Sequence, residues 1–298
     1  MYHGVVSRER DPLLDEYAIE ALAFRSHLEF LRGGYEVVPL RRIVDRVAQA
    51  EPIPAEWIAI TLDDALANQV TTAAAILFEM GFPWALAVPA GLIGTGRSIW
   101  SHELRLLVLE CWPFPSIPAP VTAEELPTRT SPQKRAAFRA INAALFDRVD
   151  DAERQAYVEG LIDRRGRAEF MDRLRDDGRF TLATWTDLER LQDAGVELLS
   201  HGWHHRPQNA TIRRQALVEE IVESRRVIAE RLGRPPAGFA LPHGAKSPET
   251  DQLIAEAGYA FCLTSRPRRV GRAARTGNIP RFAAEYPLAV LRRQLLWQ

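Results

Sequence analysis

The stretch Ile60-Thr61-Leu62-Asp63-Asp64-Ala65 ends an apolar run that starts at residue 57 and stops at two adjacent carboxylates. Short apolar runs of this kind are typical of buried strands. Together with this one, seven such runs occur, at residues 2–6, 35–39, 57–62, 83–88, 196–200, 238–241 and 261–264. Segments with helical periodicity lie between them, at residues 18–32, 70–80 and 216–232. This alternation predicts an α/β fold with a parallel sheet, and about seven strands favour a closed or nearly closed barrel.

Residues 104–180 interrupt the alternation. A proline-rich piece at residues 112–120 is followed by charged, mostly helical sequence, and no strand is evident in it. We therefore expect one domain spanning residues 1–298, with a mostly helical insertion at about 104–180 in one βα connection. Barrel enzymes place lids and substrate-shaping elements in such connections. A packing appendage without a functional role is the alternative.

The composition and net charge limit which classes of partner the protein is expected to bind. Hydrophobic residues make up 46% of the 298 residues, and 38 basic residues against 39 acidic ones give a net charge of −1. A general nucleic-acid or anionic-membrane binder needs a marked basic excess, so neither partner is expected. No apolar run approaches the ~18 residues of a membrane span. The start, Met1-Tyr2-His3, carries no secretory signal, and we expect a cytoplasmic protein; the oligomeric state is not predicted.

The carboxylates Asp63 and Asp64 follow a strand directly. Adjacent acids repel each other unless a cation or a division of roles separates them. At a strand-to-loop turn their side chains diverge, so one can bind a metal while the other faces substrate. A helix cap, where acids are also favoured, is the alternative for this motif alone.

Three of the seven histidines, His201, His204 and His205, also follow a strand. On one helical turn, residues four apart share a face, with Cβ atoms about 6 Å apart. That spacing suits His201 and His205 as ligands of a divalent metal, whereas the direction of His204 makes it the poorer ligand. A single histidine could be a core residue, but a cluster at a strand end is rarely so.

A third strand runs into Leu241-Pro242-His243-Gly244. The backbone of such a Pro-x-Gly turn can approach a ligand closely. Seen alone, this motif is better interpreted as an ordinary tight turn.

Taken in order, these three pieces resemble the motifs of the polysaccharide deacetylase family, the NodB-type carbohydrate esterases. The resemblance spans nearly the whole chain apart from the insertion. It rests on residues 61–65, 200–205 and 239–244, with support from Tyr2-His3, Thr184-Trp185 and residues 278–281.

The resemblance implies a distorted (β/α)7 barrel with its site at the carboxyl ends of the strands. It implies a divalent metal held by Asp64, His201 and His205, with an open position for water. Asp63 would be the general base, and a backbone N–H near His243 would help to stabilise the oxyanion. Zinc is the default metal for this ligand set, and nickel, cobalt, iron or manganese can also occupy it.

Three departures from the family pattern affect the predicted chemistry. No histidine follows His243, so His243 and His3 are the candidates for protonating the leaving amine. Ala240 stands where many members carry an arginine that pairs with the catalytic aspartate, and Arg281 is our candidate substitute. Leu62 and Ala65 replace the usual Phe and Gly, so we expect position 65 not to need a positive φ.

The predicted activity is metal-dependent hydrolysis of the N-acetyl group of an amino sugar in a glycan or glycoside, by a hydrolase of carbon–nitrogen (non-peptide) bonds. We expect Pro242, His3 and Trp203 to contact this N-acetylated saccharide. Trp100 and Trp112 are further stacking candidates, although core packing is the alternative for them. Two other functions stay open: an amidohydrolase of the same fold acting on a non-sugar amide such as a cyclic ureide, and a catalytically weak saccharide-binding homologue.

Overall fold

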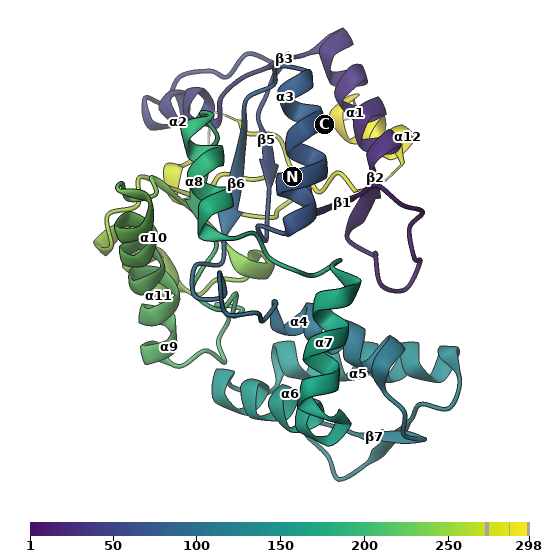
Figure 1. The fold of residues 1–298 in the computed structure, drawn as a ribbon. Helices are drawn as coiled ribbons and strands as arrows, with labels where there is room; N and C mark the ends of the chain where they lie inside the picture. Colours follow the sequence, from purple (N-terminus) through teal and green to yellow (C-terminus); the bar gives the residue numbers. More distant parts are fainter. Residues whose placement is uncertain (272–273, 286, 297–298) are drawn as a thin grey trace.

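The computed structural model describes residues 1–271, 274–285 and 287–296. Its centre is a five-stranded parallel sheet in the order β11-β10-β9-β6-β5 (Figure 1). The strands of this sheet are β5 (Ile60–Leu62), β6 (Trp84–Val88), β9 (Glu197–Ser200), β10 (Gly238–Ala240) and β11 (Phe261–Leu263). Nearly every residue in them is buried, because helices cover one face and the barrel interior takes the other.

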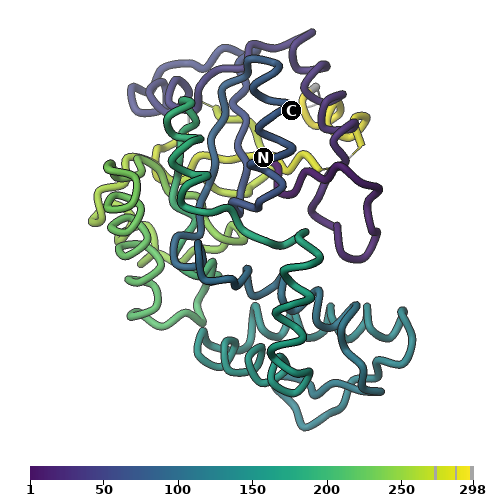
Figure 2. The backbone as a smooth tube through the Cα atoms, viewed as in Figure 1, coloured from purple at the N-terminus to yellow at the C-terminus, as the bar shows by residue number. Residues whose placement is uncertain are grey.

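The sheet curls into a ring. Parallel bridges from Tyr2 to Leu62 and from Leu263 to Ile279 add one segment at each edge, which makes seven segments. The two outer segments then meet, because the amide of Ala284 donates to the carbonyl of Met1 at 2.9 Å. Figure 2 shows this seam, with the purple start of the chain beside the yellow late segment. The distorted (β/α) barrel predicted from the sequence is confirmed.

Three pairs of short strands lie outside the central sheet. The first pair, β1 (Gly4–Val6) and β2 (Ala18–Glu20), is parallel, as is the second pair, β3 (Glu36–Val37) and β4 (Trp57–Ile58). Residues 18–20 were expected to begin a helix; instead they pair with β1. The third pair, β7 (Ser116–Pro118) and β8 (Glu125–Pro127), is antiparallel and lies inside the insertion, so the expectation of no strand there was wrong. A strand of three residues is too short for an alternation of apolar and polar residues to be recognised in the sequence.

The helices form two groups. Those of the barrel are α1 (Ala21–Gly34), α2 (Leu40–Ala48), α3 (Ala74–Glu79), α8 (Trp185–Asp193), α9 (Arg214–Val218), α10 (Ser224–Leu232), α11 (Pro248–Glu256) and α12 (Leu288–Leu296). Those of the insertion are α4 (Trp100–Leu106), α5 (Ser131–Asp147), α6 (Asp151–Arg165) and α7 (Arg167–Asp177). Wider π-type turns at Gln69–Ala73, Leu107–Cys111 and Glu219–Glu223 join α3, α4 and α10 to their neighbours.

The insertion has its own hydrophobic core. Its helices bury a set of apolar side chains separate from the barrel core, among them Trp112, Ile141, Ile162 and Phe170. In Figure 1 the teal helices α4–α7 form a separate group below the barrel. The amino end of α4 and the carboxyl end of α5 nevertheless reach the candidate metal centre, as described below. None of the helices in the described residues is long and apolar enough to cross a membrane.

Candidate metal centre

The two adjacent carboxylates at the end of β5 point in different directions because the backbone turns sharply there. The amide of Asp63 still belongs to the barrel and donates to the carbonyl of Tyr2 at 2.9 Å. Asp64 and Ala65 then adopt positive φ values of 85° and 52°. The expectation that position 65 does not need a positive φ was therefore wrong: Ala65 adopts the left-handed conformation that glycine adopts without strain.

The loop that carries His201 and His205 is irregular, so the predicted helical turn was wrong. Gly202 has a φ of 82° and His205 a φ of 57°, and this backbone path turns both rings inward. The buried carboxylate of Glu220 holds the loop in place. It accepts hydrogen bonds from the amides of Trp203, His204 and Arg206 at 3.0, 2.8 and 3.2 Å.

Asp64, His201 and His205 converge on one point. The Nε2 atoms of the two histidines lie 3.1 Å apart, and they lie 3.4 and 3.3 Å from Oδ1 of Asp64. His201 Nδ1 lies 2.8 Å from the carbonyl oxygen of Ala240, which only accepts. Nδ1 therefore carries the proton of a neutral His201, and Nε2 presents a lone pair to the cluster.

These three residues fit a divalent metal. Ligand bonds of about 2.0–2.1 Å in a tetrahedron place the ligand atoms about 3.3 Å apart. The observed separations of 3.1, 3.3 and 3.4 Å agree with that spacing. In addition, Oδ1 of Asp64 is buried without a hydrogen-bond partner, which is costly for a carboxylate oxygen unless a cation binds it.

The protonation states of the cluster favour metal binding. Burial disfavours the charged form of Asp64, but the close approach of His201 and His205 outweighs it and holds the pKa of Asp64 well below its usual range. Burial lowers the pKa of His205, so its imidazole is neutral at neutral pH. An ionised carboxylate and neutral imidazoles are the forms in which these side chains coordinate metals.

Asp63 forms a buried ion pair with Arg281, the residue predicted to replace the missing family arginine. Both carboxylate oxygens accept from the guanidinium, each at 2.7 Å, and a further bond runs to Thr61 Oγ1 at 3.1 Å. Burial alone would raise the pKa of Asp63, but the charge of Arg281 outweighs it and lowers the pKa to about 2. Asp63 is thus ionised and fixed in one orientation.

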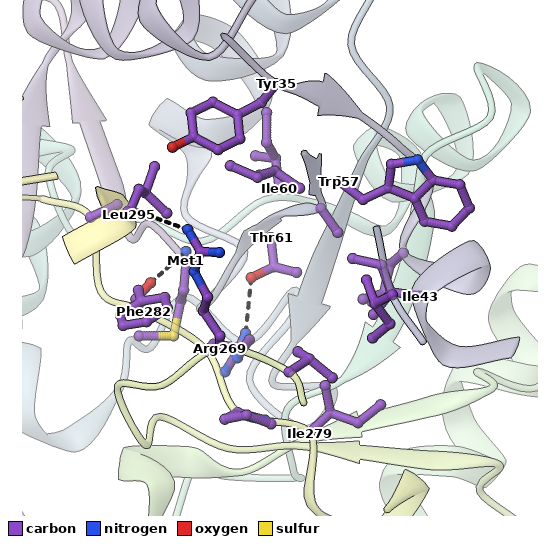
Figure 3. Close-up of a pocket in the computed structure, with 18 of the residues that line it drawn as sticks. Met1, Tyr35, Ile43, Trp57, Ile60, Thr61, Arg269, Ile279, Phe282 and Leu295 are labelled. Atoms are coloured by element: carbon purple, nitrogen blue, oxygen red, sulfur yellow. Dashed lines mark hydrogen bonds between the residues drawn. The ribbon is translucent and has the colours of Figure 1, made fainter. Parts of the chain in front are cut away.

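Arg281 also contributes to the wall of a cavity of about 270 Å³, which is drawn in Figure 3. Its wall is mainly apolar and includes Tyr35, Trp57 and Ile60. The dashed line at Thr61 in Figure 3 marks the hydrogen bond that its Oγ1 accepts from Arg281. No residue of the metal cluster contributes to this wall. The cavity is therefore a separate feature of the barrel.

His3 is part of an ion pair that also closes the barrel. Its Nδ1 atom lies 2.5 Å from a carboxylate oxygen of Glu285. Burial opposes protonation of His3, but the charge and hydrogen bond of Glu285 outweigh it and raise the pKa to about 9. The side-chain amide of Gln69 donates to the carbonyls of both His3 and Asp63, so it ties this segment to the carboxyl end of β5.

His243, the other candidate acid, has different surroundings. Its ring packs 4.6 Å from the ring of His205, 5.7 Å from Trp100 and 5.4 Å from Phe146. Burial among these rings places the pKa of His243 well below its ordinary value. The preceding Pro242 is buried and lies close to Gly202 of the metal-ligand loop. His243 is thus a neutral wall residue of the metal centre.

The predicted aromatic contacts fall into two groups. Trp112 is 2% exposed in the core of the insertion, and its indole N–H donates to the carbonyl of Ser116, so it is a core residue. Trp203 is half-buried and its ring lies directly on Gly91, where even a Cβ atom would collide with it. Its role in substrate contact stays a prediction.

Three polar residues of the site were not identified from the sequence. His102 of α4 lies 3.8 Å from the second oxygen of Asp64 and stacks on Phe180. Glu285 and Glu220 hold His3 and the metal-ligand loop, as described above. Each is a single residue at least 14 positions from its partner along the chain, with no spacing pattern. In the sequence, only their residue type, a carboxylate or an imidazole, could have indicated a role in the site.

Backbone strain gathers at this site. Five non-glycine residues in the described residues have a positive φ, and four of them are Asp64, Ala65, His205 and His243. Such conformations cost about 1–3 kcal/mol each and persist where the surrounding structure enforces them, which is common at functional sites. The strained backbone thus marks the same three strand ends as the sequence motifs.

Comparisons with known proteins agree with this geometry. Residues 159–262 match the family model for polysaccharide deacetylase. That segment contains His201, His205 and His243, whereas Asp63 and Asp64 lie outside it. A comparison with curated protein sequences found no match.

Solved structures share the fold along nearly the whole chain. IcaB from Ammonifex degensii is 17% identical, with 94% of this chain and 88% of that chain covered and a TM-score of 0.59. The Streptococcus pyogenes deacetylase PplD, solved in complex with acetate, is 12% identical, with 98% and 94% covered and a TM-score of 0.60. The BpsB deacetylase domain from Bordetella bronchiseptica is 18% identical, with 94% of each chain covered and a TM-score of 0.53. The family match and the shared fold together confirm that the chain resembles the polysaccharide deacetylases and falls in their class of hydrolase.

Proposed function

We propose that this protein is a metal-dependent N-deacetylase of amino sugars, with Asp64, His201 and His205 holding the metal and Asp63 acting as general base. One observation carries the proposal: three ligand atoms converge at 3.1–3.4 Å beside a second, ionised carboxylate. A divalent metal bound there would polarise the acetyl carbonyl and make water a better nucleophile. Zinc suits two imidazoles and a carboxylate.

Asp63 is suited to accept the proton of the attacking water. Arg281 keeps it ionised and holds both of its oxygens, so its position relative to the metal ligands is fixed. The same ion pair lowers the basicity of Asp63, as its pKa of about 2 indicates. Proton transfer to Asp63 therefore depends on the water being acidified, which is the chemistry that the metal would supply.

His3 is the better of the two candidate acids. A general acid must carry a proton at working pH, and Glu285 raises the pKa of His3 to about 9, whereas His243 is neutral. We assign the protonation of the leaving amine to His3, with Glu285 orienting its ring. His243 then contributes its backbone N–H to the oxyanion and its ring to the wall of the site.

The arrangement supports an enzyme over a saccharide-binding homologue. A binding protein has no need for an ionised base and a protonated imidazole beside a metal-ligand set, and each of these charged groups is costly to bury. The family match over residues 159–262 favours sugar N-acetyl groups over other amides. The cytoplasmic location predicted from the sequence is part of this proposal.

Acetate release from N-acetylglucosamine oligomers tests the proposal. The zinc-loaded protein should release acetate, and Asp63→Asn should lower turnover by about 10²–10⁴-fold, the usual range for a general base. Metal content, measured by elemental analysis, should stay the same because Asp63 is not a ligand, and the same analysis distinguishes zinc from nickel, cobalt, iron and manganese. Equal turnover in the two proteins would contradict the assigned mechanism.

A further inference from the structure

A second cavity, of about 160 Å³, lies between the insertion and the barrel. Its wall combines the loop after β6, the start of α4, one face of α6 and the residue that precedes the ligand His205. On this measure a water molecule needs about 10–15 Å³. The cavity therefore has room for a polar substituent of a ligand without any rearrangement of the side chains around it.

Arg154 of α6 is a buried cation in the wall of this cavity. It is 3% exposed, and its Nε and Nη2 atoms donate to the carbonyls of Leu145 and Val149. Its Nη1 atom is buried without a hydrogen-bond partner, and among the described residues Arg154 forms no ion pair. Burial accordingly lowers the pKa of Arg154 to about 10, although the side chain stays charged at neutral pH. A buried guanidinium without an anion is costly.

The carboxylates around the cavity are already neutralised. Glu103 and Glu159 each pair with Arg97 at 2.6 Å, and Asp151 pairs with Arg213 at 3.0 Å. The remaining arginine of the wall, Arg206, pairs with Glu219. Arg154 is thus the one side chain of this wall whose charge has no partner in the described residues. The cavity has a free positive charge to offer and no free negative one.

Two further residues of this wall each have a buried polar nitrogen. The indole Nε1 of Trp100 and the Nδ1 of His204 are both buried without a hydrogen-bond partner. The guanidinium of Arg154 lies 5.4 Å from the centre of the Trp100 ring. A ligand with several acceptor oxygens would satisfy the arginine and the indole together, as carboxylates and phosphates do.

This cavity adjoins the metal centre through one side chain. The Trp100 ring lies 5.7 Å from the ring of His243, which lies 4.6 Å from the ring of the ligand His205. Trp100 therefore lies near both the metal centre and Arg154. A saccharide whose N-acetyl group is at the metal would reach the cavity with its neighbouring unit, past an aromatic ring that sugars can stack on.

We propose that this cavity is a substrate subsite for an anionic oxygen group, a carboxylate or phosphate carried by the saccharide next to the N-acetylated unit. The inference rests on the proposed deacetylase function and names the substrate class: acidic saccharides. Arg154 binds the anion, and the Trp100 indole N–H contributes a second hydrogen bond.

Matched substrates test this subsite. The ratio of kcat/KM for an N-acetylglucosamine–glucuronate disaccharide to that for neutral N-acetylglucosamine disaccharide should exceed tenfold in the wild type. Arg154→Gln should lower the ratio at least tenfold, which corresponds to about 1.4 kcal/mol. Arg154→Lys should retain part of it. Arg139→Gln, at an exposed arginine of α5 in the same insertion, is the matched control and should leave the ratio unchanged. A phosphorylated disaccharide distinguishes the two kinds of anion.

The outcomes are separable from those of the proposed function. Turnover of both disaccharides at equal rates, or a wild-type ratio in Arg154→Gln, would overturn the subsite while deacetylation stands. If neither substrate is turned over, calorimetric binding of the acidic disaccharide decides: tighter binding to the wild type than to Arg154→Gln supports the subsite, and equal binding overturns it. Should Arg154→Gln fail to fold, Trp100→Phe keeps the ring, removes the N–H and must lower the ratio.

Discussion

The pairing of His3 with Glu285 makes a quantitative prediction for Glu285→Gln. The substitution removes the negative charge that raises the pKa of His3 to about 9 and keeps a similar shape. Burial then lowers that pKa while Asp63 and Asp64 raise it, so we take an unperturbed value of about 6.5 for the variant. At about pH 8 the protonated fraction of His3 falls from about nine-tenths to about 3%, a loss of roughly 30-fold in rate if His3 is the acid.

The sign of the pH dependence makes this test specific. A general acid loses activity as pH rises through its pKa, so the basic limb of the kcat/KM profile should move down from about 9 toward about 6.5 in the variant. At about pH 6 the two proteins should differ by less than about twofold. A bound metal acts on both proteins alike, so the difference between them is the measurement. Glu79→Gln, at an exposed ion pair on α3, is the matched control. An unmoved basic limb would refute the assignment of His3.

Three further predictions concern the barrel and the insertion. Arg281→Ala should lower both turnover and stability, because it leaves the carboxylate of Asp63 buried without its partner. The free energy of unfolding, measured by denaturant titration, should fall by about 3–5 kcal/mol. Intact turnover would exclude Arg281 from the mechanism. His205→Ala should abolish stoichiometric metal binding in elemental analysis, and retained binding would show that this residue is not a ligand. Trp112→Ala should destabilise the insertion by about 3–5 kcal/mol, because the Trp112 side chain is 2% exposed in the core of the insertion. An effect on KM without a loss of stability would instead indicate that Trp112 stacks on the sugar.

Much of the site could be predicted because its signals are local. Asp63 and Asp64 follow a buried strand directly, and His201 and His205 follow another, so the geometry of a parallel sheet brings them to the same edge. The assignment of Arg281 needed more than spacing. It depended on noticing that Ala240 leaves an aspartate without its usual partner, and the structure shows an arginine in that place.

The residues that sequence reasoning missed act over long distances. Glu285 contacts His3 across 282 positions, and His102 reaches Asp64 from a helix of the insertion. Neither residue has a second histidine or acidic side chain at helical or strand spacing from it, as His205 has in His201. No local pattern therefore distinguishes Glu285 or His102 from a polar residue on the surface. The irregular loop at His205 was missed for a different reason: Glu220, which lies outside the loop, accepts from the amides on both sides of His205, at His204 and Arg206.

The seam that closes the barrel also sets when the protein can become active. Residues 1–3 are synthesised long before their partners Glu285 and Ala284, and Asp63 long before its partner Arg281. The metal-ligand loops lie between these positions, so they can form before the groups that orient the base and the acid are present. A chain truncated before residue 281 should therefore be able to bind metal without hydrolysing substrate.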